Sequence, residues 1–367
     1  MTTSLHHLRE HGQSPWIDYL SRSFVRDGDL QALIDAGVVG LTSNPTIFQA
    51  AIADGDAYDE QMRQVLSEHS EPKDVFLELA RDDVQRACDV LRPVFDREDS
   101  TRDGWVSLEV DPNLAYDAAG TAEEARRLHR MVDRPNLFVK IPGTEPGLEA
   151  IEESIAAGIP INVTLLFSLQ RHREAAEAYV RGLRRLREGG GDLGAVASVA
   201  SFFVSRVDTE ADRRLDELGG HDELKGKLGI ANARLAYQTY KELFSGPQWE
   251  ELERAGASPQ RCLWASTSTK NPEYRDVLYV EELIGPQTVD TMPRETVEAF
   301  LDHGQVDDTL ERNTEEARRT FEQFRAAGID YEDIVAVLER EGVEKFASSF
   351  RDLFDVVSGK RDELIAA

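Results

Sequence analysis

Short apolar runs alternate with longer helix-like stretches along most of this 367-residue chain. Strands that alternate with helices pair in parallel, because two consecutive strands that run the same way need a long crossover between them. About eight such units in one chain predict a closed barrel. The sequence therefore predicts an α/β fold, a (β/α)₈ TIM barrel with extra helices. The strand-like runs cover residues 16–20, 38–42, 105–110, 137–141, 160–167, 195–203, 261–266 and 288–292.

Helical patterns also fill stretches that the barrel does not need. Two insertions, at about 45–104 and 205–258, and a C-terminal tail at about 314–364 have such patterns. No Pro/Ser-rich linker divides the chain, so we expect a single domain over residues 1–367. Within the barrel, the helix expected over 121–132 opens with Thr121 and Glu124, a spacing that is typical of a capping box.

The charge balance restricts the function classes. The chain has 42 Lys and Arg against 69 Asp and Glu, a formal net charge of −27. Such a surface repels a phosphate backbone or an anionic membrane, so we expect neither nucleic acid nor a membrane as a partner. Only eight of the basic residues are lysine. An acidic, lysine-poor surface fits adaptation to high salt and fits an ordinary acidic protein equally well.

Localisation follows from what the sequence lacks. No apolar run approaches the roughly 20 residues that cross a bilayer, and residues 1–16 show no signal-peptide pattern. Two cysteines, Cys88 and Cys262, do not make a disulfide framework.

The eight histidines show no metal-ligand spacing with one another or with the cysteines. We therefore expect a cytoplasmic protein that needs no metal or other cofactor.

Polar residues interrupt several predicted strands and share one face of each. Successive side chains of a strand point to opposite faces, so alternate residues lie on the same face. Because helices cover the outside of a barrel, the polar face has to be the interior. The residues that this rule places inside are Ser107 and Glu109, Phe138 and Lys140, Asn162 and Thr164, and Ser201 and Phe203.

Lys140 is the most informative of these residues, because an unpaired lysine in an apolar strand is costly to bury. One interpretation is a snorkelling or salt-bridged lysine at a strand end. The other is a nucleophilic amine, kept neutral by burial, that forms a Schiff base. Glu109 on a nearby strand is then either an ion-pair partner or an acid/base for the proton transfers of imine formation.

Four segments of the chain resemble signature segments of the transaldolases and occur in that family's order. They are LTSNP at 41–45, VSLEV at 106–110, VKIP at 139–142 and INVTLLF at 161–167. The resemblance runs from about residue 16 to about residue 300. Residues 278–293 resemble the longer bacterial branch of the class I enzymes rather than the short aldolase-like branch.

The resemblance implies chemical roles for matching residues. Lys140 would form the Schiff base with a ketose phosphate, and Glu109 and Thr164 would hold a water that relays protons. Asp18 would remove the hydroxyl proton when the carbon–carbon bond breaks. The alternative for Asp18 is a structural contact with Arg22 or Arg26.

The resemblance also implies how the substrate is bound. Asn44, Asn162 and Ser201 would hydrogen-bond the dihydroxyacetone unit, and Arg206 would meet the phosphate. The segment 265–271 lacks the second phosphate-binding arginine of many relatives, and Lys270 is its nearest cation. We expect Lys270 to add a point charge, helped by the hydroxyl of Ser266 or Ser268. The alternative is that Lys270 only pairs with Glu273 or Asp276.

The expected activity is transfer of a dihydroxyacetone unit from sedoheptulose 7-phosphate to glyceraldehyde 3-phosphate. The products are erythrose 4-phosphate and fructose 6-phosphate, as in the non-oxidative pentose phosphate pathway. Two alternatives stay open: a fructose-6-phosphate aldolase-type lyase with the same lysine chemistry, and an inactive sugar-phosphate-binding barrel. The partners are then sugar-phosphate substrates, and the protein is a monomer or a homodimer.

Overall fold

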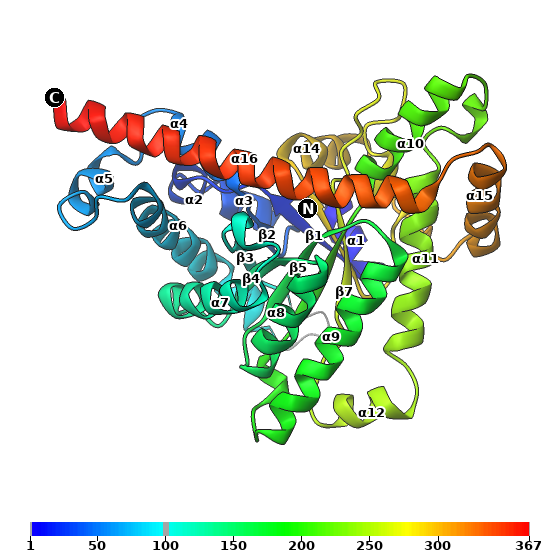
Figure 1. Cartoon of the computed structure of the whole chain (residues 1–367), viewed down its shortest axis with the longest axis horizontal. Helices are drawn as coiled ribbons and strands as arrows, with labels where there is room; N and C mark the ends of the chain where they lie inside the picture. Colours follow the sequence, from blue (N-terminus) through cyan, green and yellow to red (C-terminus); the bar gives the residue numbers. More distant parts are fainter. Residues whose placement is uncertain (1, 98–102, 367) are drawn as a thin grey trace.

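The computed structural model describes residues 2–97 and 103–366, and its core is a closed barrel (Figure 1). Within these residues, eight parallel strands each pair with their sequence neighbours, and β8 closes the barrel against β1. The predicted (β/α)₈ barrel is confirmed, although β1 begins three residues before its predicted start and β2 has only two residues. The strands are β1 (Gln13–Asp18), β2 (Leu41–Thr42), β3 (Val106–Glu109), β4 (Leu137–Pro142), β5 (Ile161–Leu166), β6 (Ser198–Phe203), β7 (Arg261–Ala265) and β8 (Thr288–Met292).

Helices surround the barrel and fill the stretches that were expected to be helical insertions. The helices between the strands are α2 (Arg22–Arg26), α3 (Asp29–Asp35), α4 (Pro45–Ala53), α5 (Asp59–Val65), α6 (Pro72–Phe95), α7 (Ala118–Val132), α8 (Glu145–Ala156), α9 (Leu169–Glu188), α10 (Ser205–Leu218), α11 (Leu228–Leu243), α12 (Pro247–Arg254) and α13 (Leu278–Glu282). Outside the strands lie α1 (Ser4–Glu10), α14 (Arg294–His303), α15 (Thr314–Ala326) and α16 (Tyr331–Ala366). The single-domain organisation stays a prediction. In the described part of the chain, no helix is both long and apolar enough to cross a membrane.

The start of α7 corrects the capping-box prediction. The helix begins at Ala118, and the side chain of Asp117 caps it by accepting a hydrogen bond from the Gly120 amide. Thr121 lies inside the first turns, where its hydroxyl donates to the Leu114 carbonyl. Glu124 instead forms an ion pair with Lys73 on α6. The Thr121/Glu124 spacing was therefore wrong as a helix start, because an earlier aspartate caps the chain.

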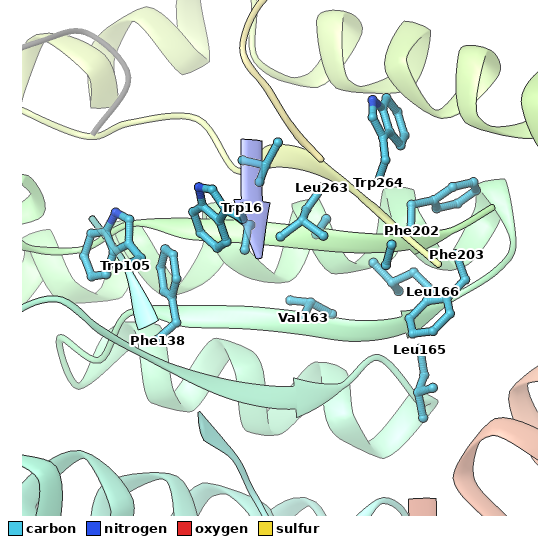
Figure 2. Packing of buried hydrophobic residues seen from close by; sticks show 14 of the residues in the cluster. Trp16, Trp105, Phe138, Val163, Leu165, Leu166, Phe202, Phe203, Leu263 and Trp264 are labelled. Atoms are coloured by element: carbon cyan, nitrogen blue, oxygen red, sulfur yellow. The ribbon is translucent and has the colours of Figure 1, made fainter. Parts of the chain in front are cut away.

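The register of the strands brings the polar residues to one end of the barrel. Glu109 is paired with Lys140, and Lys140 with Asn162, across three adjacent strands. Below them, large aromatic side chains fill the interior: the Trp105 and Phe138 ring centroids are 4.1 Å apart. Figure 2 shows Trp16 beside these two rings. The barrel is thus packed through its middle and is polar only towards its ends.

The amino-terminal end of the barrel holds a buried ion pair. Arg261, the first residue of β7, contacts Asp103 at 3.0 Å, and both side chains are under 10% exposed. Ser14 on β1 bridges the pair, because its hydroxyl accepts from Arg261 and donates to the other Asp103 oxygen, each at 2.9 Å. Asp103 directly follows the residues that the structure does not describe. This triad joins three distant segments at the end of the barrel opposite Lys140.

The C-terminal helix α16 is the longest helix of the described chain, with 36 residues. It runs along the top of the view in Figure 1, from α15 to a C-terminus beside α4 and α5. Along the way it packs against α4, α10 and β5. The helix therefore reaches the carboxyl end of the barrel, where the polar strand residues lie.

Candidate active site

A pocket of about 300 Å³ opens at the carboxyl ends of the barrel strands. In TIM barrels this is the end where active sites form, because the loops that follow the strands converge there. Seven of the nine predicted site residues line the pocket: Asp18, Asn44, Lys140, Thr164, Ser201, Arg206 and Lys270. Glu109 and Asn162 lie beneath the lining.

Lys140 and Glu109 form a buried pair at the floor of the pocket. Lys140 Nζ lies 3.3 Å from Glu109 Oε2 and 3.3 Å from the carbonyl oxygen of Ser43. The two side chains are 6% and 2% exposed. Burial raises the pKa of Glu109 to about 6, although the positive charge of Lys140 opposes the rise. A carboxyl group with this pKa can both give and take a proton near neutral pH.

Three buried oxygens at this pair have hydrogen-bonding capacity to spare. Among the described residues, Glu109 Oε1 and the Thr164 hydroxyl have no hydrogen-bond partner, and Glu109 Oε2 has only the 3.3 Å ion pair with Lys140. The backbone near Thr164 is irregular: Leu165 has a φ of 58°, and the β5–β6 pairing shifts between Val163 and Leu166. Bulges of this kind re-aim side chains beside active sites. Unpaired buried oxygens at such a place are suited to a substrate or a water.

Asp18 lies at the end of β1, on the wall next to Lys140. Its carboxylate accepts a hydrogen bond of 2.6 Å from the Thr42 hydroxyl. Burial raises the pKa of Asp18 above its ordinary value, while Lys140 and Thr42 oppose the rise. The alternative role for Asp18 was a structural contact with Arg22 or Arg26. Among the described residues, these two arginines pair with other carboxylates instead, Arg22 with Asp83 and Arg26 with Asp27.

The predicted amide and hydroxyl contacts lie at two depths. Asn44 lines the pocket and caps α4 by accepting from the Ile47 amide, which leaves its Nδ2 group for another partner. Asn162 is fully buried below the lining: it donates to Ser107 at 3.0 Å and accepts from Ser201 at 2.7 Å. The Asn162 side chain therefore holds Ser201 in place, and its direct contact with substrate stays a prediction.

The basic end of the pocket contains Arg206 and Lys270. The Arg206 guanidinium stacks over Phe203, with its carbon 5.0 Å from the ring centroid, and burial lowers its pKa. Lys270 Nζ donates to the Ser268 hydroxyl at 2.7 Å. Lys270 forms no ion pair with Glu273 or Asp276 among the described residues, and Asp276 pairs with His303 instead. Both cations therefore face the pocket, as the sequence predicts.

The pocket residues that sequence reasoning missed include Lys345 and Phe346, which come from α16. The Phe346 ring centroid lies 5.6 Å from Lys140 Nζ and 6.0 Å from the Arg206 guanidinium carbon. The tail was expected to be helical, but no local pattern says where a helix docks. The rarity of lysine was the one available signal, because only eight occur in the chain. Glu295 of α14, also missed, lies on the pocket wall.

Comparisons with known proteins identify the family to which the chain is similar. The family model described as "Transaldolase/Fructose-6-phosphate aldolase" matches residues 15–357. A transaldolase of Acidothermus cellulolyticus is 50% identical over 361 residues, which cover 98% of this chain and 97% of the relative. A protein named "Transaldolase 2" from Streptomyces avermitilis is 48% identical over 96% of both chains. A transaldolase of Mycobacterium tuberculosis is 49% identical over 93% of both chains.

Proposed function

The chain belongs to the transaldolase/fructose-6-phosphate aldolase family and is a transaldolase, and we propose that Lys140 carries its reaction as a Schiff base. The observation that carries the assignment is the buried Lys140–Glu109 pair at the mouth of the barrel, 3.3 Å apart. The other two lysines of the pocket, Lys270 and Lys345, are exposed. Only Lys140 has an acid/base group beside it and an apolar strand around it.

In the proposed first half-reaction, the Lys140 amine adds to the ketone carbon of sedoheptulose 7-phosphate. Loss of water from this adduct gives a protonated imine. Glu109, with its pKa near 6, and Thr164 pass protons to and from the departing hydroxyl through a bound water. The imine at C2 then draws in the electrons of the C3–C4 bond, which breaks as the C2=C3 double bond of an enamine forms. Asp18 takes the proton of the hydroxyl group beyond that bond, so erythrose 4-phosphate leaves and a neutral enamine stays on Lys140.

In the second half-reaction, the enamine carbon attacks the aldehyde of glyceraldehyde 3-phosphate. Asp18 returns its proton to the new hydroxyl group, and hydrolysis of the imine releases fructose 6-phosphate. Asn44 and Ser201 hold the three-carbon fragment without offering it a strong acid. This restraint favours transfer to an acceptor over protonation and release, which a fructose-6-phosphate aldolase would carry out.

Borohydride reduction tests the assignment of Lys140. With fructose 6-phosphate and no acceptor, borohydride should fix a three-carbon adduct on Lys140 and inactivate the enzyme, because reduction of the imine is irreversible. Peptide mapping identifies the modified lysine, and Lys270 and Lys345 serve as internal controls in the same pocket. An adduct on either of them, with Lys140 unmodified, contradicts the proposal. Release of free dihydroxyacetone without an acceptor would favour the aldolase alternative.

The metabolic setting that we propose is the non-oxidative pentose phosphate pathway in the cytoplasm. The transaldolase relatives support the pathway. The two buried free cysteines, Cys88 and Cys262, support a reducing compartment such as the cytoplasm. We further propose that the enzyme works as a monomer or a homodimer. Sedimentation at several protein concentrations separates these two states and would reveal a larger assembly.

A further inference from the structure

Lysine is rare in this protein and concentrated at the pocket. The chain contains eight lysines, and three of them, Lys140, Lys270 and Lys345, line the candidate active-site pocket. Four of the others, at positions 73, 225, 241 and 360, pair with carboxylates elsewhere in the described structure. The chain has 69 acidic residues, but the charged neighbours of Lys345 in the pocket are cations.

The surroundings of Lys345 are positive. Arg206 and Lys270 are its main electrostatic neighbours, and the charge of Arg206, with burial and Lys270 adding to it, lowers the pKa of Lys345. Within the described residues, Lys345 forms no ion pair with a carboxylate, although Glu341 lies one helical turn earlier. Like charges held together destabilise a protein unless an anion joins them. The three cations therefore make a site that is suited to an anion.

The helix that carries Lys345 is fixed over the pocket. At Gly342, an added Cβ would lie only 3.1 Å from Leu165 of β5, so the missing side chain lets the helix approach the barrel closely. Phe346 is 5% exposed and packs between Lys140 and Arg206. One turn later, Ser349 accepts a hydrogen bond of 2.8 Å from Thr46, which itself lines the pocket. Lys345 is thus held at the rim by contacts on both sides of it.

The pocket lining carries charges of both signs. The lining contains the carboxylates Asp18 and Glu295, and its positive charges come from Lys140 and from Arg206, Lys270 and Lys345. A phosphate is repelled by the first group and attracted by the second. With its phosphate bound to the cations, a sugar phosphate can place its carbonyl carbon at Lys140 on the pocket floor.

We propose that Lys345, supplied by the C-terminal helix, binds the substrate phosphate together with Arg206 and Lys270. This inference rests on the proposed function, since it assigns a specificity-determining residue to the same pocket. Lys345 takes the place of the second phosphate-binding arginine, which the segment 265–271 lacks. Its ammonium group gives a point charge, and Arg206 gives the planar two-donor contact. The C-terminal helix is then part of the active site.

Three variants test the role of Lys345. Lys345→Met keeps the length and apolar stem of the side chain and removes its charge, and Lys345→Arg restores the charge. The matched control is Arg351→Met, which removes a positive charge from an exposed position of the same helix, six residues on. Calorimetry measures the Kd for inorganic phosphate, and steady-state kinetics measure kcat and KM for fructose 6-phosphate.

Lys345→Met should raise both the phosphate Kd and the KM by about fivefold to tenfold, which lies within the range for the net loss of one ordinary hydrogen bond and suits an exposed side chain. Its kcat should stay within about twofold, because the reacting atoms are untouched. Lys345→Arg and Arg351→Met should stay close to the parent in every constant. An unchanged phosphate Kd in Lys345→Met overturns the proposal, as does a loss confined to kcat.

The phosphate titration separates this inference from the proposed function. If the parent protein showed no turnover and no borohydride adduct, the proposed function would fail, but the phosphate Kd would still report on Lys345. If the parent is active and Lys345→Met binds phosphate as the parent does, only the role of Lys345 fails. Circular dichroism of each variant checks that α16 remains folded, and the Arg351→Met control reports any general effect of charge on the helix.

Discussion

The barrel contains two buried ion pairs, one at each end, and they are built differently. At the amino-terminal end, Arg261 and Asp103 are bridged by Ser14, and each contact is between 2.9 and 3.0 Å. At the carboxyl end, Lys140 and Glu109 are 3.3 Å apart, and beyond this contact neither Glu109 oxygen has a hydrogen-bond partner among the described residues. Both pairs are under 10% exposed, so burial alone does not distinguish them.

The difference lies in hydrogen bonding. A buried pair whose hydrogen bonds are complete stabilises one arrangement of the chain and has little capacity left for a ligand. A buried pair with unsatisfied oxygens makes the protein less stable. Such pairs occur at functional sites, where the substrate supplies the missing hydrogen bonds. We therefore expect different responses to mutation at the two ends of the barrel. Substitution at the carboxyl end should lower activity, and substitution at the amino-terminal end should lower stability.

The largest effect is expected for Lys140→Arg. Arginine keeps the positive charge but cannot form an imine, so turnover should fall by at least about 10⁴-fold. The protein should remain folded, since Glu109 keeps a cationic neighbour. Assay of kcat/KM together with thermal unfolding measures both quantities. Residual turnover above about 1% of the parent would show that another group can replace Lys140.

Arg261→Met should have the next largest effect, on stability and not on chemistry. The substitution leaves Asp103 buried without its cation, so the free energy of unfolding should fall by about 3–5 kcal/mol. Urea unfolding measures this change, and the double variant Arg261→Met/Asp103→Asn should recover part of it. The folded fraction should keep kcat within about threefold of the parent. A loss of kcat as large as that of Lys140→Arg would end the distinction between the two pairs.

The catalytic end of the barrel was easier to predict from sequence than the structural end. Lys140 and Glu109 lie in strands whose alternating pattern marks them as interior, so a local rule finds them. Arg261 begins its strand and Asp103 precedes one, and no local pattern joins residues 158 positions apart. Lys345 was missed for the same reason, because the position of α16 depends on tertiary packing around Gly342. Periodicity fixes which face a residue takes but not what docks against it.

Glu109→Gln should separate proton transfer from binding. Glutamine keeps the shape of glutamate but cannot exchange a proton, so kcat should fall by about 10²–10³-fold, while KM changes little. The matched control is Glu124→Gln on α7, a buried glutamate that pairs with Lys73 away from the pocket. Single-turnover borohydride trapping should show slower imine formation in Glu109→Gln alone. Unchanged turnover would give Glu109 a purely structural role.

The smallest effect is a pH dependence of stability that belongs to Glu109. Burial raises the pKa of this carboxyl group from 4.5 to about 6, so the folded state binds the proton more tightly than the unfolded state. Between these two pH values the unfolded chain has already released the proton, and stability falls as the pH rises. The total loss should be about 2 kcal/mol, most of it between pH 4.5 and pH 6 and the remainder within about one pH unit on either side.

This dependence is best measured as a difference between the parent and Glu109→Gln. Other buried carboxyl groups titrate in the same direction, because burial also raises the pKa of Asp208 and of Asp290 to about 7. Both proteins contain these groups, so subtraction removes their contribution. Urea unfolding from pH 4 to pH 8 should show the parent losing stability relative to Glu109→Gln up to about pH 7, and a constant difference above it. A difference that is independent of pH would mean that Glu109 is ionised throughout, as the carboxylate of a completed ion pair would be.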